Sequence, residues 1–126
     1  MIILNRNVDE LLQFLPLYGD MLSVKEAYWV SRDVNVIKRQ GKIQGNFRDK
    51  LYTKYGSPMK DGRPGELELI GANKDKFIEA WETFLDNEID VEIKPIMIKR
   101  IEELKAEGKT INTQMMAGLN TIIVIE

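Results

Sequence analysis

The clearest pattern in the sequence is a long run of apolar residues at helical spacing between Ser23 and Lys54. Ser23 and Glu26 form the Ser-x-x-Glu signature of a capping box, and no proline follows until Pro58. Along the run, apolar residues recur mostly at intervals of three or four: Ala27, Val30, Val34, Ile37, Ile43, Phe47, Leu51 and Tyr55. This pattern predicts one helix over about 23–54 with an apolar stripe along one side.

Gly41 weakens the stripe near its middle and costs about 1 kcal/mol relative to alanine inside a helix. We therefore expect a slight bend at Gly41 or a close contact with another helix.

The length of this helix is its most informative property. An unbroken helix over 23–54 spans about 48 Å, whereas a compact domain of this size is about 28–35 Å across. The remaining residues should therefore leave part of the stripe uncovered, which predicts a homo-oligomer. Its interface would use Val30, Val34, Ile37, Phe47 and Leu51. The alternative is a helix that breaks at Gly41 and folds back as a monomeric hairpin.

Shorter elements precede and follow the long helix. Asn7 caps a helix of about two turns that should stop near Pro16 or Gly19. Residues 55–65 are rich in turn formers and include the tight-turn signal Asp61-Gly62.

Residues 66–70 and 88–96 alternate between charged and apolar residues, which predicts two strands. They should pair antiparallel across a helix over 74–85 that is capped by Asn73. Pro95 should lie at the end or edge of that pair.

The C-terminal part predicts helices over 98–107 and 114–119. The Ile-rich residues 121–126 should form a strand or a segment buried against the long helix. The sequence as a whole predicts one mostly helical α+β domain over residues 1–126, with a small antiparallel element of two or three strands.

Composition removes several kinds of chemistry. The chain contains no Cys and no His, which excludes disulfides, thiolate nucleophiles, Cys/His zinc sites and imidazole acid–base catalysis. No apolar run approaches the roughly 18–20 residues of a membrane span, and the N-terminus lacks the pattern of a secretion signal. We expect a cytoplasmic protein that is not an enzyme, has no cofactor and has no membrane partner.

Charge is unevenly distributed along the chain. Residues 25–63 contain ten basic and four acidic residues, whereas the rest contain eight basic and sixteen acidic ones, so the net charges are +6 and −8. The two halves could complement each other, within one chain or between subunits. The basic half could instead form a surface for an anionic ligand.

One constellation suits a nucleotide or a single-stranded nucleic acid. It consists of Tyr28, Trp29, Arg32, Arg39 and Arg48, in which aromatic rings can stack on bases and guanidinium groups can clamp phosphate. The alternative is that the aromatic residues belong to the core or a subunit interface and that the basic residues pair with the acidic half. A pI of about 5.3 argues against general DNA binding.

Three carboxylates, Glu88, Asp90 and Glu92, should share one face of a strand. Such a row could bind Mg²⁺ or Ca²⁺. We interpret it as the solvent face of an amphipathic strand, where like charges discourage edge pairing, and we predict no metal site.

Through residues 25–33, 50–56 and 77–96, taken in this order, the chain resembles a family of small tailed-phage and prophage proteins of uncharacterised function. The chain departs from the family pattern after Pro95. The resemblance implies a small, mostly helical, non-enzymatic phage protein and carries over no active site.

Three functions follow as hypotheses. The first is an oligomeric interaction protein without catalysis, which serves virion assembly or host takeover and contacts itself and a phage or host protein. The second is an anti-defence protein that sequesters a small anionic nucleotide at an oligomer interface. The third is a divalent-metal-dependent enzyme that uses the acidic strand.

Overall fold

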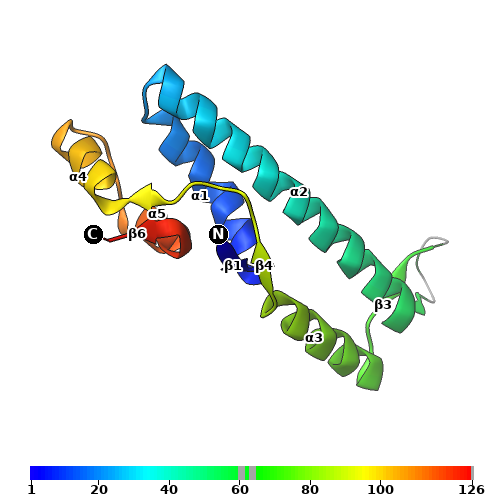
Figure 1. The fold of residues 1–126 in the computed structure, drawn as a ribbon. Helices are drawn as coiled ribbons and strands as arrows, with labels where there is room; N and C mark the ends of the chain where they lie inside the picture. Colours follow the sequence, from blue (N-terminus) through cyan, green and yellow to red (C-terminus); the bar gives the residue numbers. More distant parts are fainter. Residues whose placement is uncertain (60–61, 63–64, 126) are drawn as a thin grey trace.

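The structure, a computed structural model, describes residues 1–59, 62 and 65–125. It is mostly helical with short paired strands, so the predicted α+β class is confirmed (Figure 1). The helices are α1 (Val8–Asp20), α2 (Val24–Tyr55), α3 (Gly71–Leu85), α4 (Ile98–Ala106) and α5 (Thr113–Leu119), with 3₁₀ turns at Asn5–Asn7 and Asn120–Ile122. The strands are β1 (Ile2–Leu4), β2 (Ser57–Pro58), β3 (Leu67–Glu68), β4 (Glu88–Asp90), β5 (Ile96–Met97) and β6 (Ile123–Val124).

The long helix α2 begins and ends where the sequence predicts. Ser23 caps it, because the Ser23 side chain accepts a hydrogen bond from the Glu26 backbone N–H. The helix continues through Gly41 without interruption. A Cβ at Gly41 would lie 3.1 Å from Cδ1 of Leu12, so the expected close contact with another helix is confirmed.

Helix α1 lies antiparallel beside the N-terminal half of α2 (Figure 1). The helix was predicted to stop near Pro16 or Gly19, and the second position is confirmed, because α1 continues through Pro16 to Asp20. Its 13 residues exceed the predicted two turns. Proline inside a helix costs about 3 kcal/mol. Leu15 and Tyr18 are buried on either side of Pro16, and the apolar area they remove from water offsets that cost.

Most of the apolar stripe of α2 is covered by the chain itself, whereas Ile43 stays 53% exposed. Val34 and Ile37 are buried in one cluster with residues of α1, and Leu51 is buried further along α2. Val30 and Phe47 are half-buried. The covering helices remove the physical reason for which we expected an oligomer interface through these five residues.

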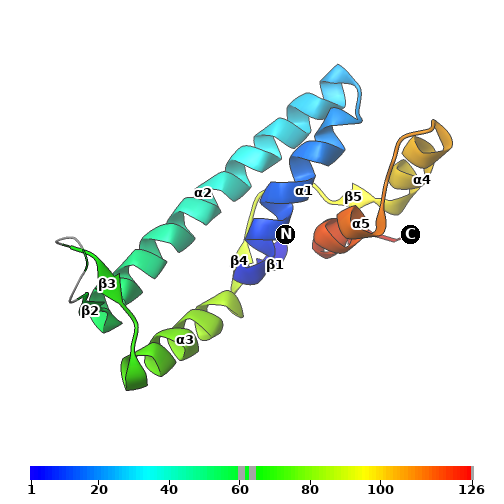
Figure 2. The ribbon, with the colours of Figure 1, turned by 180° about the vertical axis from the view of Figure 1, so that it is seen from behind.

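Helix α3 covers the C-terminal half of α2 through aromatic side chains. The Phe47 ring stacks on Phe84 with 4.3 Å between centroids, and Tyr52 lies 4.7 Å from Phe77. The helix begins at Gly71, not after Asn73 as predicted. The chain thus forms an extended frame in which α1 and α3 share the length of α2 (Figure 2).

The predicted pairing of residues 66–70 with 88–96 is wrong. Strand β3 pairs antiparallel with β2, whereas β4 pairs antiparallel with β1. The physical reason is α3, whose fifteen residues separate β3 from β4 by about 22 Å. The strand predicted over 88–96 is also not continuous, because only Glu88–Asp90 and Ile96–Met97 form strands in this region.

The C-terminal region follows the predictions more closely. Helix α4 ends just before Gly108, which has a φ of +88°, and Asn112 caps α5 by accepting a hydrogen bond from the Met115 N–H. The Ile-rich end forms a strand, β6, which pairs parallel with β5. The predicted Asp61-Gly62 turn includes Asp61, which lies outside the described residues. Among the helices that the structure describes, none is both long and apolar enough to cross a membrane.

Candidate functional site

A groove of about 490 Å³ lies between α2 and residues 92–94 of the extended segment that joins β4 to β5. We call it the α2 groove. It brings together three of the five predicted ligand residues, Trp29, Arg32 and Arg39. Its other lining residues are Asp33, Asn35, Val36, Glu92, Ile93 and Lys94. A second hollow of about 310 Å³ shares Val36, Arg39 and Glu92 with it and extends it to Ile43.

Trp29 stands at one end of the groove between two cations. The ammonium nitrogen of Lys94 lies 4.3 Å from the centroid of the Trp29 ring, and the Arg32 guanidinium carbon lies 5.3 Å from it. Both distances fall within the range of cation–π attraction. Trp29 remains 40% exposed, so the ring holds two positive charges at the rim of the groove.

Asp33 of α2 binds the opposite wall of the groove, which is formed by residues 92–94. One of its carboxylate oxygens accepts a hydrogen bond of 3.1 Å from the Lys94 backbone N–H. Burial raises the pKa of Asp33, whereas the hydrogen bond from Lys94 acts in the opposite direction. The cations Arg32, Arg39 and Lys94 outnumber the carboxylates of Asp33 and Glu92 by one, so the side chains that line the groove carry a net positive charge.

Two predicted ligand residues lie elsewhere. Tyr28 packs edge-on against Trp29 with 5.5 Å between centroids, but it points outward, is 59% exposed and does not line the groove. Arg48 follows Arg39 by nine residues, which is two and a half helical turns. It therefore lies on the opposite side of α2, so including it in the ligand set was wrong.

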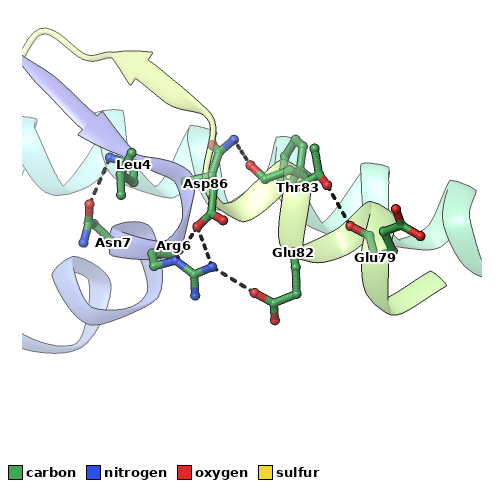
Figure 3. Close-up of polar contacts among 9 residues, drawn as sticks. Leu4, Arg6, Asn7, Glu79, Glu82, Thr83 and Asp86 are labelled. Atoms are coloured by element: carbon green, nitrogen blue, oxygen red, sulfur yellow. Dashed lines mark hydrogen bonds and ion pairs between the residues drawn. The ribbon is translucent and has the colours of Figure 1, made fainter. Parts of the chain in front are cut away.

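The basic residues of α2 do not pair with the acidic half of the same chain. In the part of the chain that the structure describes, every ion pair uses Arg6, Arg100 or the N-terminal ammonium as its cation. Arg6 binds Glu82 and Asp86, as Figure 3 shows. The eight basic side chains of α2 are all exposed: Lys25, Arg32, Lys38, Arg39, Lys42, Arg48, Lys50 and Lys54.

A second stripe runs along α2 outside the buried one, and the sequence analysis missed it. We call it the cationic seam. Its members alternate at intervals of four and three residues, the spacing of a helix–helix seam: Lys25, Trp29, Arg32, Val36, Arg39, Ile43, Asn46 and Lys50. All but the half-buried Val36 are exposed. The signal was visible in the spacing, but Ile43 had been assigned to the buried stripe.

The predicted acidic row is divided between different partners. The Asp90 carboxylate accepts a 3.0 Å hydrogen bond from the N-terminal ammonium, and Glu92 lines the α2 groove. Within the described residues, no three Asp, Glu, His or Cys side chains are grouped so that they could hold a metal ion.

Comparisons with known proteins give no relative from which a function could be transferred. No protein-family model matches the chain, and neither the search of curated proteins nor that of solved structures finds a match.

Proposed function

We propose that the chain is a non-enzymatic interaction protein that works as a homo-oligomer and that α2 is its binding element. The resemblance described above supports placing it in a tailed phage or prophage, where it would serve virion assembly or host takeover. It would act in the cytoplasm of the infected cell or as part of the virion.

The cationic seam carries this proposal. Exposed cations alone are ordinary on a helix surface and gain little from an intramolecular partner. Here they alternate with Trp29, Val36 and Ile43, and Ile43 is 53% exposed. Apolar side chains at these intervals supply the contacts that a partner helix needs, and the cations between them select a partner with negative charge.

Light scattering coupled to size exclusion tests the proposal. We expect a mass above the 14.6 kDa of one chain at micromolar concentration in about 0.05 M salt, and a lower mass in about 0.5 M salt, because salt screens exposed charges. A mass of one chain at every concentration and salt level would refute the oligomer.

A second function, sequestration of a small anionic nucleotide, is favoured by the α2 groove. Trp29 offers an aromatic ring, and Arg32, Arg39 and Lys94 offer phosphate donors around about 490 Å³ of space. A base that stacked on the ring face beneath Lys94 would have to displace the Lys94 ammonium.

A thermal-shift panel of cyclic dinucleotides and ADP-ribose derivatives tests this second function. A ligand of this groove should raise the melting temperature of the protein and quench Trp29 fluorescence, and Arg39→Ala should abolish both effects. An unchanged melting temperature with every nucleotide would refute it.

A further inference from the structure

We propose that the cationic seam of α2 docks against the acidic outer face of α3 in a second copy of this chain. The proposal rests on the homo-oligomer proposed above and specifies which surfaces meet.

The outer face of α3 has the charge and spacing that match the seam. Asp75, Glu79, Glu82 and Asp86 recur at intervals of four and three residues, which places them on one side of the helix. Phe77, Trp81 and Phe84 occupy the opposite side and face α2 of the same chain. The acidic side is therefore directed away from α2 of its own chain.

Two of these four acids already have an intramolecular partner. Arg6 lies 2.9 Å from Glu82 and 2.7 Å from Asp86. Asp75 and Glu79 are exposed, and within the described residues neither lies within 4 Å of a cation. Figure 3 shows Glu79 farther from the Arg6 guanidinium along α3 than Glu82 and Asp86 are. These two carboxylates are the ones left for a second copy.

Apolar contact accompanies the charge match. Ile78 follows Asp75 by three residues and precedes Glu82 by four on α3, and it is 47% exposed. On the seam, Val36 follows Arg32 by four residues and precedes Arg39 by three. Ile78 of one copy can therefore pack against Val36 and Ile43 of another, with arginine–carboxylate pairs on either side, in the manner of a helix that binds a groove.

The charge distribution favours a second copy over a foreign partner. Residues 25–63 carry +6 and the rest of the chain carries −8, yet the cations of α2 make none of the ion pairs of the described residues. The cations of α2 and the carboxylates of Asp75 and Glu79 thus remain available for contacts between chains. A twofold axis would let each copy supply one seam and one acidic face.

Charge reversal with mutual rescue tests the docking. The variants R32E/R39E and D75K/E79K change only exposed side chains, so circular dichroism should show both folded. Each alone should weaken self-association by at least tenfold, because the contact then juxtaposes like charges (about 1.4 kcal/mol per tenfold). Mixed in equal amounts, the two should associate again, because the reversed seam then meets the reversed acidic face.

The control variant K38E/R48E makes the same change of charge on other faces of α2 and should associate like the wild type. A wild-type oligomer that R32E/R39E leaves intact, or a mixture that stays monomeric, would overturn the docking and leave the oligomer standing. A monomeric wild type would overturn both. R32E/R39E could instead lose a nucleotide-induced thermal shift while the mass of its oligomer stays that of the wild type. That result would assign the groove to a ligand and overturn the docking.

Discussion

Gly118 offers a sharp test of how α5 packs against α1. A Cβ at this position would overlap Cδ2 of Phe14 and lie 2.6 Å from Cε2 of the same ring. Helix propensity alone predicts that Gly118→Ala stabilises the protein by about 1 kcal/mol. Overpacking of a well-filled core costs about 1–3 kcal/mol, and contacts this short belong at the upper end. We therefore expect a net loss of about 2 kcal/mol in the free energy of unfolding.

Gly45 provides the matched control, because it lies inside α2 and a Cβ there would meet nothing within 4 Å. Gly45→Ala should stabilise the protein by about 1 kcal/mol through propensity alone. Urea unfolding followed by circular dichroism measures both values, and the two variants should differ by about 3 kcal/mol. A Gly118→Ala protein as stable as the Gly45→Ala protein would show that Phe14 does not cover α5.

Three further variants test other contacts. Arg100 lowers the pKa of Glu26 by two hydrogen bonds of 2.9 Å. The pair therefore stabilises the fold above the usual carboxyl pKa of 4.5, and this stabilisation is lost as the pH falls below 4.5 and Glu26 becomes protonated. Glu26→Gln should cost about 0.5–1 kcal/mol at neutral pH, since the pair is partly solvent-screened, and the difference from wild type should vanish in acid unfolding curves. Phe47→Ala should cost about 2 kcal/mol, less than a fully buried ring, and shift the emission of Trp81. Gln44→Leu removes a buried 2.7 Å hydrogen bond to the Asn5 carbonyl and should cost about 1–3 kcal/mol in thermal unfolding.

Local signals were sufficient to predict the boundaries of α2, α4 and α5. The Ser23 cap, the positive-φ Gly108 and the Asn112 cap each act within one turn, so the sequence around them determines where α2, α4 and α5 begin or end. For α1 the local pattern left two stops open, Pro16 and Gly19, because the burial that retains Pro16 in the helix comes from contacts with α2 and the core.

Strand pairing could not be predicted from local pattern. Residues 66–70 and 88–96 both alternate, but partner choice depends on where α3 places their ends, and β1, whose pattern drew no notice, takes β4 as its partner. Strands of two or three residues carry too few side chains to specify a register by alternation alone.

The candidate site was predicted in part. Trp29, Arg32 and Arg39 share the α2 groove, because residues three and seven apart lie near one face of a helix. Lys94 joins them from 55 positions beyond Arg39, and only the fold reveals that. The exclusion of Arg48 needed only the helical period, since nine residues make two and a half turns.

The absence of cysteine from the sequence allows the docking of the seam on α3 to be tested by site-specific crosslinking. Arg39→Cys and Glu79→Cys proteins, mixed and treated with a short bis-maleimide, should give a crosslinked heterodimer as the main product. The mixture of Arg48→Cys with Glu79→Cys should give little, because Arg48 lies on the far side of α2 from Arg39. Equal crosslinking in the two mixtures, or none in the first, would contradict the proposal that α2 binds the acidic face of a second copy.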